Sequence, residues 1–174
     1  MLRRTISPDY ILYKLGDEHS GLSGGWGSYA ESYGAPYTAS SDYAALTKQS
    51  TSLRISWGVS YGSYSGAVRT MALVDLTSIS TLSFHSPGCS LAPVQTDGWE
   101  YVYVFIRPSA DTYWGTRSTI IKGNSSTSNY VTGSGTYTLD VSSYSGLFFV
   151  GIGTAIRDTN ATSYIDIDLV EMIP

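Results

Sequence analysis

Two stretches, Asp75-Leu-Thr-Ser-Ile-Ser-Thr-Leu-Ser-Phe84 and Asp140-Val-Ser-Ser-Tyr-Ser-Gly-Leu-Phe-Phe149, repeat one pattern and decide the fold. In each, a strand-like run ends at an Asp, a hydroxyl-rich corner follows, and a new strand opens on Leu. An Asp beside Ser and Thr accepts hydrogen bonds from nearby backbone N–H groups and so holds a tight corner. Apolar residues on both sides can then enter one core from two directions. The repeat predicts a β-sandwich whose chain crosses between two sheets at each copy.

Outside these corners, apolar and polar residues alternate, as in 52–59 and 164–170. A period of two is typical of strands with one solvated face. No stretch of a dozen residues shows a capped 3.6-residue period, so we expect little or no helix, at most one short turn near 42–46. We expect an all-β jelly-roll β-sandwich of about 8–10 antiparallel strands. The expected strands are 10–15, 51–59, 67–74, 80–85, 100–107, 117–122, 136–141, 146–155 and 163–171, with at least one more within 26–38.

The length of 174 residues predicts one domain over 10–174, preceded by a short N-terminal arm over 1–9. Charged residues make up only 14% of the chain, against about 25% in typical soluble domains. The net charge of −4 disfavours nucleic acid as a partner. The longest apolar stretch, 147–156, is far shorter than the roughly 20 residues of a membrane-spanning helix. The first ten residues contain no apolar segment typical of a signal peptide, which predicts synthesis in a cytoplasm without export by the general secretory route.

Catalytic motifs are weak. Gly21-Leu-Ser-Gly-Gly25 matches the G-x-S-x-G pattern, but no strand precedes it and no helix follows it, as a nucleophile elbow requires. His19 and His85 lack the spacing of metal or base motifs. Cys89 is the only cysteine and is expected to be a small packing residue. The sequence therefore predicts a protein without enzymatic activity.

Aromatic residues give the strongest functional signal. Fifteen Tyr and four Trp exceed what a core built from Val, Ile and Leu needs, although Trp57 is expected in that core. If successive strands run antiparallel, loops 60–66, 86–99, 123–135 and 156–162 share one end, and the two Asp corners share the other with loop 108–116. A sugar site combines a stacking ring with amide, carboxylate or guanidinium groups. The candidate binding rim on the long loops is Tyr61, Tyr64, Trp99, Asn124, Asn129, Tyr130, Arg157, Asp158 and Asn160. The alternative is that these rings pack under their own loops or against another subunit.

Three segments carry a family resemblance: Val74-Asp-Leu-Thr-Ser-Ile-Ser-Thr-Leu-Ser-Phe84, Leu139-Asp-Val-Ser-Ser-Tyr-Ser-Gly-Leu-Phe-Phe-Val-Gly-Ile152 and Ile165-Asp-Ile-Asp-Leu-Val-Glu-Met-Ile173. They resemble the galactose-binding-like jelly rolls, which include carbohydrate-binding modules and accessory domains of bacteriophage tail, fibre and decoration proteins. The opening Leu12-Tyr-Lys-Leu-Gly16, followed by Gly24-Gly-Trp26, is similar to the start of such phage domains. The resemblance covers residues 10–173 in pattern.

The resemblance implies a non-enzymatic structural or adhesion protein of a bacteriophage particle, located in the tail, fibre or capsid decoration of the virion. Its expected partners are other virion proteins or copies of itself, and host surface glycans. The alternative is a free-standing carbohydrate-binding module or lectin, and a glycan-degrading enzyme is the least favoured reading. No cofactor is expected, apart from the structural calcium ion that sugar-binding jelly rolls often hold near the chain ends. Calcium takes six to eight oxygen ligands, for which Asp17, Asp166 and Asp168 are weak candidates; a solvent-facing strand side is the favoured alternative for the last two.

Overall fold

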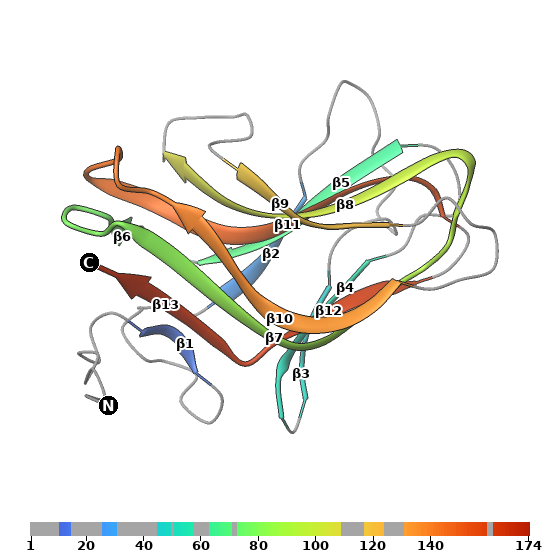
Figure 1. Cartoon of the computed structure of the whole chain (residues 1–174), viewed down its shortest axis with the longest axis horizontal. Helices are drawn as coiled ribbons and strands as arrows, with labels where there is room; N and C mark the ends of the chain where they lie inside the picture. The colour runs from blue at the N-terminus through green and yellow to red at the C-terminus, as the bar shows by residue number, and fades with distance from the viewer. Residues whose placement is uncertain are drawn as a thin grey trace.

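The computed structural model consists of two antiparallel β-sheets packed face to face (Figure 1). It describes residues 11–14, 26–30, 45–49, 51–57, 63–70, 73–108, 117–123, 131–159 and 162–174, and these residues include no helix. Only the backbone is described for 11–14, 26–30, 45–48, 63–70, 94–99, 117–118 and 154–159. In this part of the chain, no helix is long and apolar enough to cross a membrane. The prediction of an all-β sandwich is confirmed.

Within the described part of the chain, sheet A has seven strands and sheet B has six. In sheet A the order is β1 (Ile11–Lys14), β13 (Leu169–Ile173), β7 (Thr81–Leu91), β12 (Ser163–Ile167), β4 (Leu53–Trp57) and β3 (Ala45–Lys48), and β10 (Val131–Asp140) also pairs with β7. In sheet B the order is β2 (Trp26–Ala30), β5 (Ser63–Thr70), β11 (Leu147–Thr159), β8 (Val94–Pro108) and β9 (Arg117–Lys122), and the two-residue β6 (Val74–Asp75) also pairs with β11.

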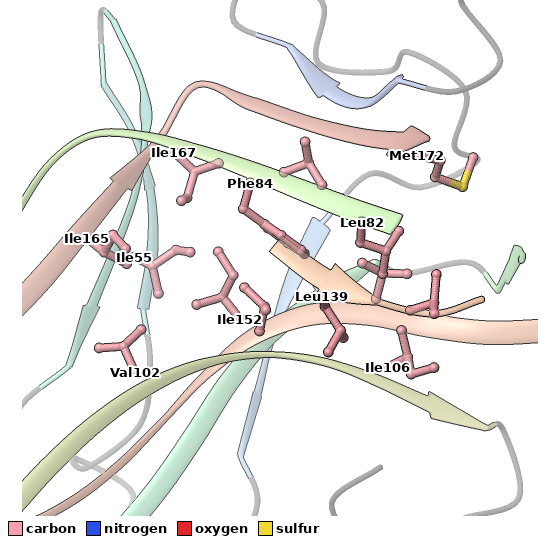
Figure 2. Close-up of a cluster of buried hydrophobic side chains, with 14 of the residues drawn as sticks. Ile55, Leu82, Phe84, Val102, Ile106, Leu139, Ile152, Ile165, Ile167 and Met172 are labelled. Atoms are coloured by element: carbon pink, nitrogen blue, oxygen red, sulfur yellow. The ribbon is translucent and has the colours of Figure 1, made fainter. Parts of the chain in front are cut away.

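The hydrophobic core lies between the sheets. Alternate residues of β8, among them Val102 and Ile106, point into it together with Ile152 of β11 (Figure 2). Sheet A supplies the facing side chains, which Figure 2 shows gathered around Phe84. The predicted core residue Trp57 and the predicted packing residue Cys89 are both buried in this cluster, so both predictions are confirmed.

The two repeated Asp stretches form the two predicted crossings between sheets. β6 of sheet B leads into β7 of sheet A, and β10 of sheet A leads into β11 of sheet B. Asp75 accepts a hydrogen bond from the Thr77 backbone N–H at 2.9 Å, and Asp140 accepts two from Ser142, from the backbone N–H at 2.9 Å and the hydroxyl at 2.7 Å. These hydrogen bonds lower the pKa of both carboxyl groups.

The corners also hold each other. The backbone N–H of Leu76 donates to the carbonyl of Gly146 at 2.8 Å, and that of Val141 donates to the carbonyl of Ser80 at 2.9 Å. Leu76 and Val141 follow the two Asp residues directly and are fully buried. Gly146 has φ of 98°, a conformation that glycine adopts without steric cost. The repeated sequence therefore builds one paired corner at one end of the sandwich.

Several strand limits differ from the sequence expectation. The expected short turn near 42–46 is wrong for Ala45 and Leu46, which belong to strand β3, and 42–44 lie outside the described residues. The expected loop 86–99 is also wrong, because β7 continues to Leu91 and β8 begins at Val94. Pro87 and Gly88 lie where the β7–β10 register shifts, and a bulge accommodates Pro in a strand. The described residues form thirteen strands rather than about 8–10, partly because the last expected strand is interrupted at Asp168.

Strand pairing confirms that the long connections share one end, which we call the loop end. The residues that flank these connections are paired with one another: Trp57 with Ser163, Ser63 with Arg157, Leu91 with Val131, and Val94 with Thr159. The two Asp corners lie at the opposite end, on the left in Figure 1. Most residues of the connections themselves lie outside the described residues.

Candidate functional site

One strand of sheet B places a row of aromatic residues on the face that points away from the core. Because Val102, Val104 and Ile106 of β8 are buried in the core, the alternate positions of β8 belong to the outer face of the sheet. We call the four aromatic residues at these positions the aromatic row: Trp99, Tyr101, Tyr103 and Phe105. Successive members are two residues apart, so the row is about 20 Å long.

The strand beside the row offers small residues. Ala155, Gly153 and Gly151 of β11 lie opposite Tyr101, Tyr103 and Phe105, respectively. A Cβ atom at Gly153 would lie 2.3 Å from the Tyr103 ring, so this ring extends across β11. Small residues on the neighbouring strand therefore leave room for the rings of the row to lie along the sheet.

The row is not equally accessible along its length. Tyr103 and Phe105 are only 1% and 3% exposed, and their ring centroids are 6.1 Å apart. Tyr101 is partly exposed, and Trp99 follows it toward the loop end. Among the members of the row whose side chains are described, the accessible one is therefore Tyr101, at the end of the row nearest the loop end.

We expect Gly153→Ala to lower the free energy of unfolding by about 1–3 kcal/mol, because the new methyl group must displace a buried ring. Urea unfolding measures the change. The matched control is Gly133→Ala in β10, where an added Cβ meets no atom within 4 Å. Equal effects of the two substitutions would contradict the packing of Tyr103 on Gly153.

Basic residues flank the accessible end of the row on both sides. Lys122 of β9 is paired with Tyr101 and is exposed, with its Nζ 5.6 Å from the centroid of the Tyr101 ring. Arg157 of β11 is paired with Trp99. The Tyr101 ring and the Lys122 ammonium thus provide a stacking surface and a hydrogen-bond donor in one place, and the backbone pairing brings Trp99 and Arg157 to the same end of the sheet.

The structure brings together only part of the predicted rim. Trp99 and Arg157 are directly opposite each other, but in strands rather than in loops. Tyr64 is paired with Ile156 and therefore belongs to the core-facing side of sheet B, so it is separated from Trp99. Asp158 lies at an irregularity of the β11–β8 pairing, between Arg157 and Thr159. Five rim residues lie outside the described residues: Tyr61, Asn124, Asn129, Tyr130 and Asn160.

Sequence reasoning missed the row, although its signal is present. Trp99, Tyr101, Tyr103 and Phe105 alternate without interruption, and a period of two places them on one face of a strand. The run 101–107 was predicted only as a strand of β-branched and aromatic residues with one solvated face. The small residues of the neighbouring strand, which complete the site, become visible only from the pairing of β8 with β11.

The two described calcium candidates are each engaged by a basic side chain. Asp166 accepts two hydrogen bonds from Arg54, at 2.9 and 2.8 Å, which raise the pKa of Arg54. The Arg54 guanidinium also lies 3.7 Å from the centroid of the Tyr164 ring. Asp168 is 2.5 Å from Nδ1 of His85. Asp17 lies outside the described residues, among which no cluster of three or more His, Cys, Asp or Glu could hold a metal ion; the calcium site stays a prediction.

A buried carboxyl lies directly beneath the row. Glu100 precedes Tyr101 in β8, is 0% exposed and points to the core side, where its Oε1 accepts a hydrogen bond from the Trp57 indole at 2.8 Å. Its Oε2 has no hydrogen-bond partner. Burial raises the pKa of Glu100, while hydrogen bonds from Ser163 and Trp57 act in the opposite direction. Glu100 is therefore part of the core and does not face a ligand on the outer side.

The raised pKa of Glu100 predicts a pH dependence of stability. The folded chain binds this proton more tightly than the unfolded chain, in which a Glu side chain has a pKa of about 4.3. Stability from this group is therefore present at low pH and is lost as the pH rises through the folded-state pKa. We expect Glu100→Gln to remove this loss, so its stability relative to the wild type increases between pH 4 and pH 8. The free energy of unfolding of both chains is measured with urea at each pH. A constant difference between the two chains from pH 4 to pH 8 would contradict this prediction.

Two solved structures share this fold at low sequence identity. One comes from work on the promiscuous specificity of carbohydrate-binding modules from the β-sandwich superfamily, with a TM-score of 0.56, 11% identity, and coverage of 93% of this chain and 61% of that one. The other is Caldicellulosiruptor saccharolyticus CBM27-1 in complex with mannohexaose, with a TM-score of 0.51 and 12% identity. The match covers 94% of this chain and 96% of that one. No protein-family model and no curated protein matches the sequence. The fold is that of the β-sandwich carbohydrate-binding modules, and neither structure provides a link to phage particles.

Proposed function

We propose that this chain is a non-catalytic glycan-binding module that holds a carbohydrate chain against the outer face of sheet B, over Trp99 and Tyr101. The observation that carries the proposal is the aromatic row on β8 beside the small residues of β11. The C–H faces of sugar rings stack on aromatic rings, while a few polar groups fix the orientation of the hydroxyl groups. Lys122 and Arg157 are positioned on the flanking strands for that second role.

The position of Trp99 and Tyr101 joins this face to the loop end. Arg157, paired with Trp99, is followed within two residues by the end of β11, and Lys122 ends β9. A glycan over these rings would therefore lie beside the connections that follow both strands. Such connections commonly supply the residues that select a ligand on a rigid sheet.

A binding role is supported by the position of Glu100. Glycoside hydrolysis generally needs two carboxyl groups on either side of the scissile bond. Glu100, the carboxyl adjacent to Tyr101 in the strand, is buried on the opposite side of the sheet and is hydrogen-bonded to Trp57. Between Trp99 and Pro108, β8 therefore has no Asp or Glu on the face of the sheet that carries the aromatic row.

The observations favour the carbohydrate-binding module over the virion component that the sequence analysis placed first. The fold similarity is to carbohydrate-binding modules, and a glycan-binding face needs no larger assembly to act. Location in a virion and association with virion proteins or with copies of itself stay predictions.

Affinity gel electrophoresis through a panel of soluble polysaccharides tests the proposal. Mannan, galactan, xylan and mixed-linkage glucan represent neutral chains, and polygalacturonate, alginate and chondroitin sulfate represent acidic ones. We expect at least one polysaccharide to retard the protein relative to a gel without polysaccharide. Unchanged migration in every gel, together with no binding on a glycan array, would overturn the proposed function.

A further inference from the structure

We infer that Glu100 is a positioning residue for the glycan site, and that the site binds its ligand best while this buried carboxyl is uncharged. The inference rests on the proposed function and concerns the regulation of the same site by pH. Three observations support it: the place of Glu100 next to the accessible ring, the hydrogen bonds that join it to both sheets, and its one oxygen without a hydrogen-bond partner among the described residues.

The backbone of Glu100 adjoins the site directly. Glu100 precedes Tyr101 in β8, and its carbonyl accepts a hydrogen bond from the backbone N–H of Gly123 at 2.8 Å. Gly123 follows Lys122, whose Nζ lies 5.6 Å from the centroid of the Tyr101 ring. This hydrogen bond therefore joins the two residues adjacent to the ring and the ammonium group of the site, so a displacement of Glu100 would disturb both groups.

The side chain of Glu100 joins the same point of β8 to the opposite sheet. Its Oε1 accepts a hydrogen bond at 2.8 Å from the indole of Trp57, the last residue of β4. Ser163, the first residue of β12, is paired with Trp57 and also hydrogen-bonds to the carboxyl. The Ser163 hydroxyl in turn accepts a hydrogen bond at 2.8 Å from the backbone N–H of Ala92, between β7 and β8. One carboxyl thus connects sheet B to two strands of sheet A at the loop end.

These surroundings suit an uncharged carboxyl better than a carboxylate. Glu100 is 0% exposed, and its Oε2 has no hydrogen-bond partner among the described residues. A buried charge is costly unless it is paired and hydrogen-bonded, and an unpaired oxygen adds to this cost. Burial accordingly raises the pKa of Glu100, although the hydrogen bonds from Ser163 and Trp57 act in the opposite direction.

No described cation faces this carboxyl from the strands around it. On the core side, Cys89 of β7 has a thiol pKa that is raised by burial and also by Glu100, and Tyr64 of β5 belongs to the core-facing side of sheet B. Asp97 and Asp158 lie where the β8–β11 pairing is irregular, and their side chains are not described. The other titratable residues of the strands packed around Glu100 occupy outer positions near it or farther along the sheets: Lys122 of β9, Arg157 of β11, Arg54 of β4, Asp166 of β12 and His85 of β7.

Ionisation of Glu100 is therefore expected to loosen the loop end. Water reaches the buried Oε2 only if β8 moves away from the strands of sheet A that cover it, and this movement disturbs Tyr101 and the hydrogen bond from Gly123. The closed form binds the glycan and also keeps the proton, so each of the two favours binding of the other. Glycan binding is then strongest at low pH and weakens as the pH rises through the folded-state pKa of Glu100.

A proton titration of the ¹⁵N- and ¹³C-labelled wild type tests the coupling without any glycan. The side-chain carboxyl carbon of Glu100, the indole N–H of Trp57 and the backbone N–H of Gly123 are followed by NMR from pH 3 to pH 9. We expect all three signals to change with one common midpoint, above the ordinary Glu pKa of about 4.3. A carboxyl midpoint at or below about 4.3, no titration up to pH 9, or a Gly123 signal that does not follow the carboxyl would overturn the inference.

Calorimetry then measures binding of the polysaccharide that retards the wild type most, at one pH below this midpoint and one above it. We expect the affinity of the wild type to be about fivefold or more lower at the higher pH. Glu100→Gln keeps an acceptor for the Trp57 indole but does not ionise, so it should bind equally at both pH values. The control is Glu171→Gln in β13 of sheet A, which should retain the pH dependence of the wild type.

The outcomes separate this inference from the proposed function. A wild-type affinity that does not change with pH, or an unchanged pH dependence in Glu100→Gln, would overturn the inference and leave the proposed function standing. No binding to any polysaccharide of the panel at either pH would remove the proposed function and, with it, the inference.

Discussion

The double substitution Trp99→Ala and Tyr101→Ala is expected to weaken glycan binding by about a hundredfold or more. The two rings occupy consecutive outer positions of β8, so one sugar chain can stack on both. Truncating a central aromatic anchor at a binding site commonly costs more than 1 kcal/mol, and about 1.4 kcal/mol corresponds to a factor of ten. Each single substitution is therefore expected to weaken binding by about tenfold, measured by calorimetry with the polysaccharide that retards the wild type most.

Tyr164→Ala provides the control for the double substitution. Tyr164 is a partly exposed ring on the outer side of sheet A, next to Arg54, and its loss should leave glycan affinity unchanged. Circular dichroism verifies that each variant keeps its β-sheet content. If the double variant binds as well as the wild type and the Tyr164 variant does not, the binding face has been assigned to the wrong sheet.

Phe84→Ala is expected to lower the free energy of unfolding by about 3–5 kcal/mol, the usual cost of removing a buried phenyl ring. Phe84 is 0% exposed and lies in β7, which pairs with β10 on one side and with β12 and β13 on the other. Figure 2 shows its ring among core side chains of both sheets. The cavity left by the substitution would therefore loosen the packing of one sheet on the other.

Urea unfolding of the Phe84 variant is compared with that of Thr138→Ala. Thr138 is exposed in β10, which pairs with β7 beside Phe84, and its substitution should change stability by no more than about 0.5 kcal/mol. A loss below about 1 kcal/mol for Phe84→Ala would show that this side chain is not in a close-packed interior.

The parts of the fold that depend on local chemistry could be predicted from the sequence. The hydrogen bonds of Asp75 and Asp140 involve residues only two positions away, so the corners are visible in ten residues of sequence. Strand 117–122 was predicted with its observed limits. The end of the sandwich that collects the long connections also followed from simple alternation of strand direction.

The parts that depend on pairing could not be predicted. Trp99 was assigned to a loop because the expected strand began only at residue 100, yet pairing with β11 holds Trp99 in a strand opposite Arg157. Tyr64 was grouped with Trp99 because both were assigned to loops at one end, but the register of β5 places it on the core-facing side of the sheet. A shift of one residue exchanges the two faces of a strand, so only the register could separate these two aromatic residues.

The central claim, that a glycan binds to the outer face of sheet B, is tested most directly by NMR. The ¹⁵N-labelled chain is titrated with an oligosaccharide of the best-binding polysaccharide, and changes in amide and indole N–H chemical shifts are mapped onto the strands. We predict that the largest changes occur at Trp99, Tyr101 and Lys122 and at the facing residues of β11, 155–157. Changes concentrated instead on β7, β10 and β13 of sheet A would contradict the claim.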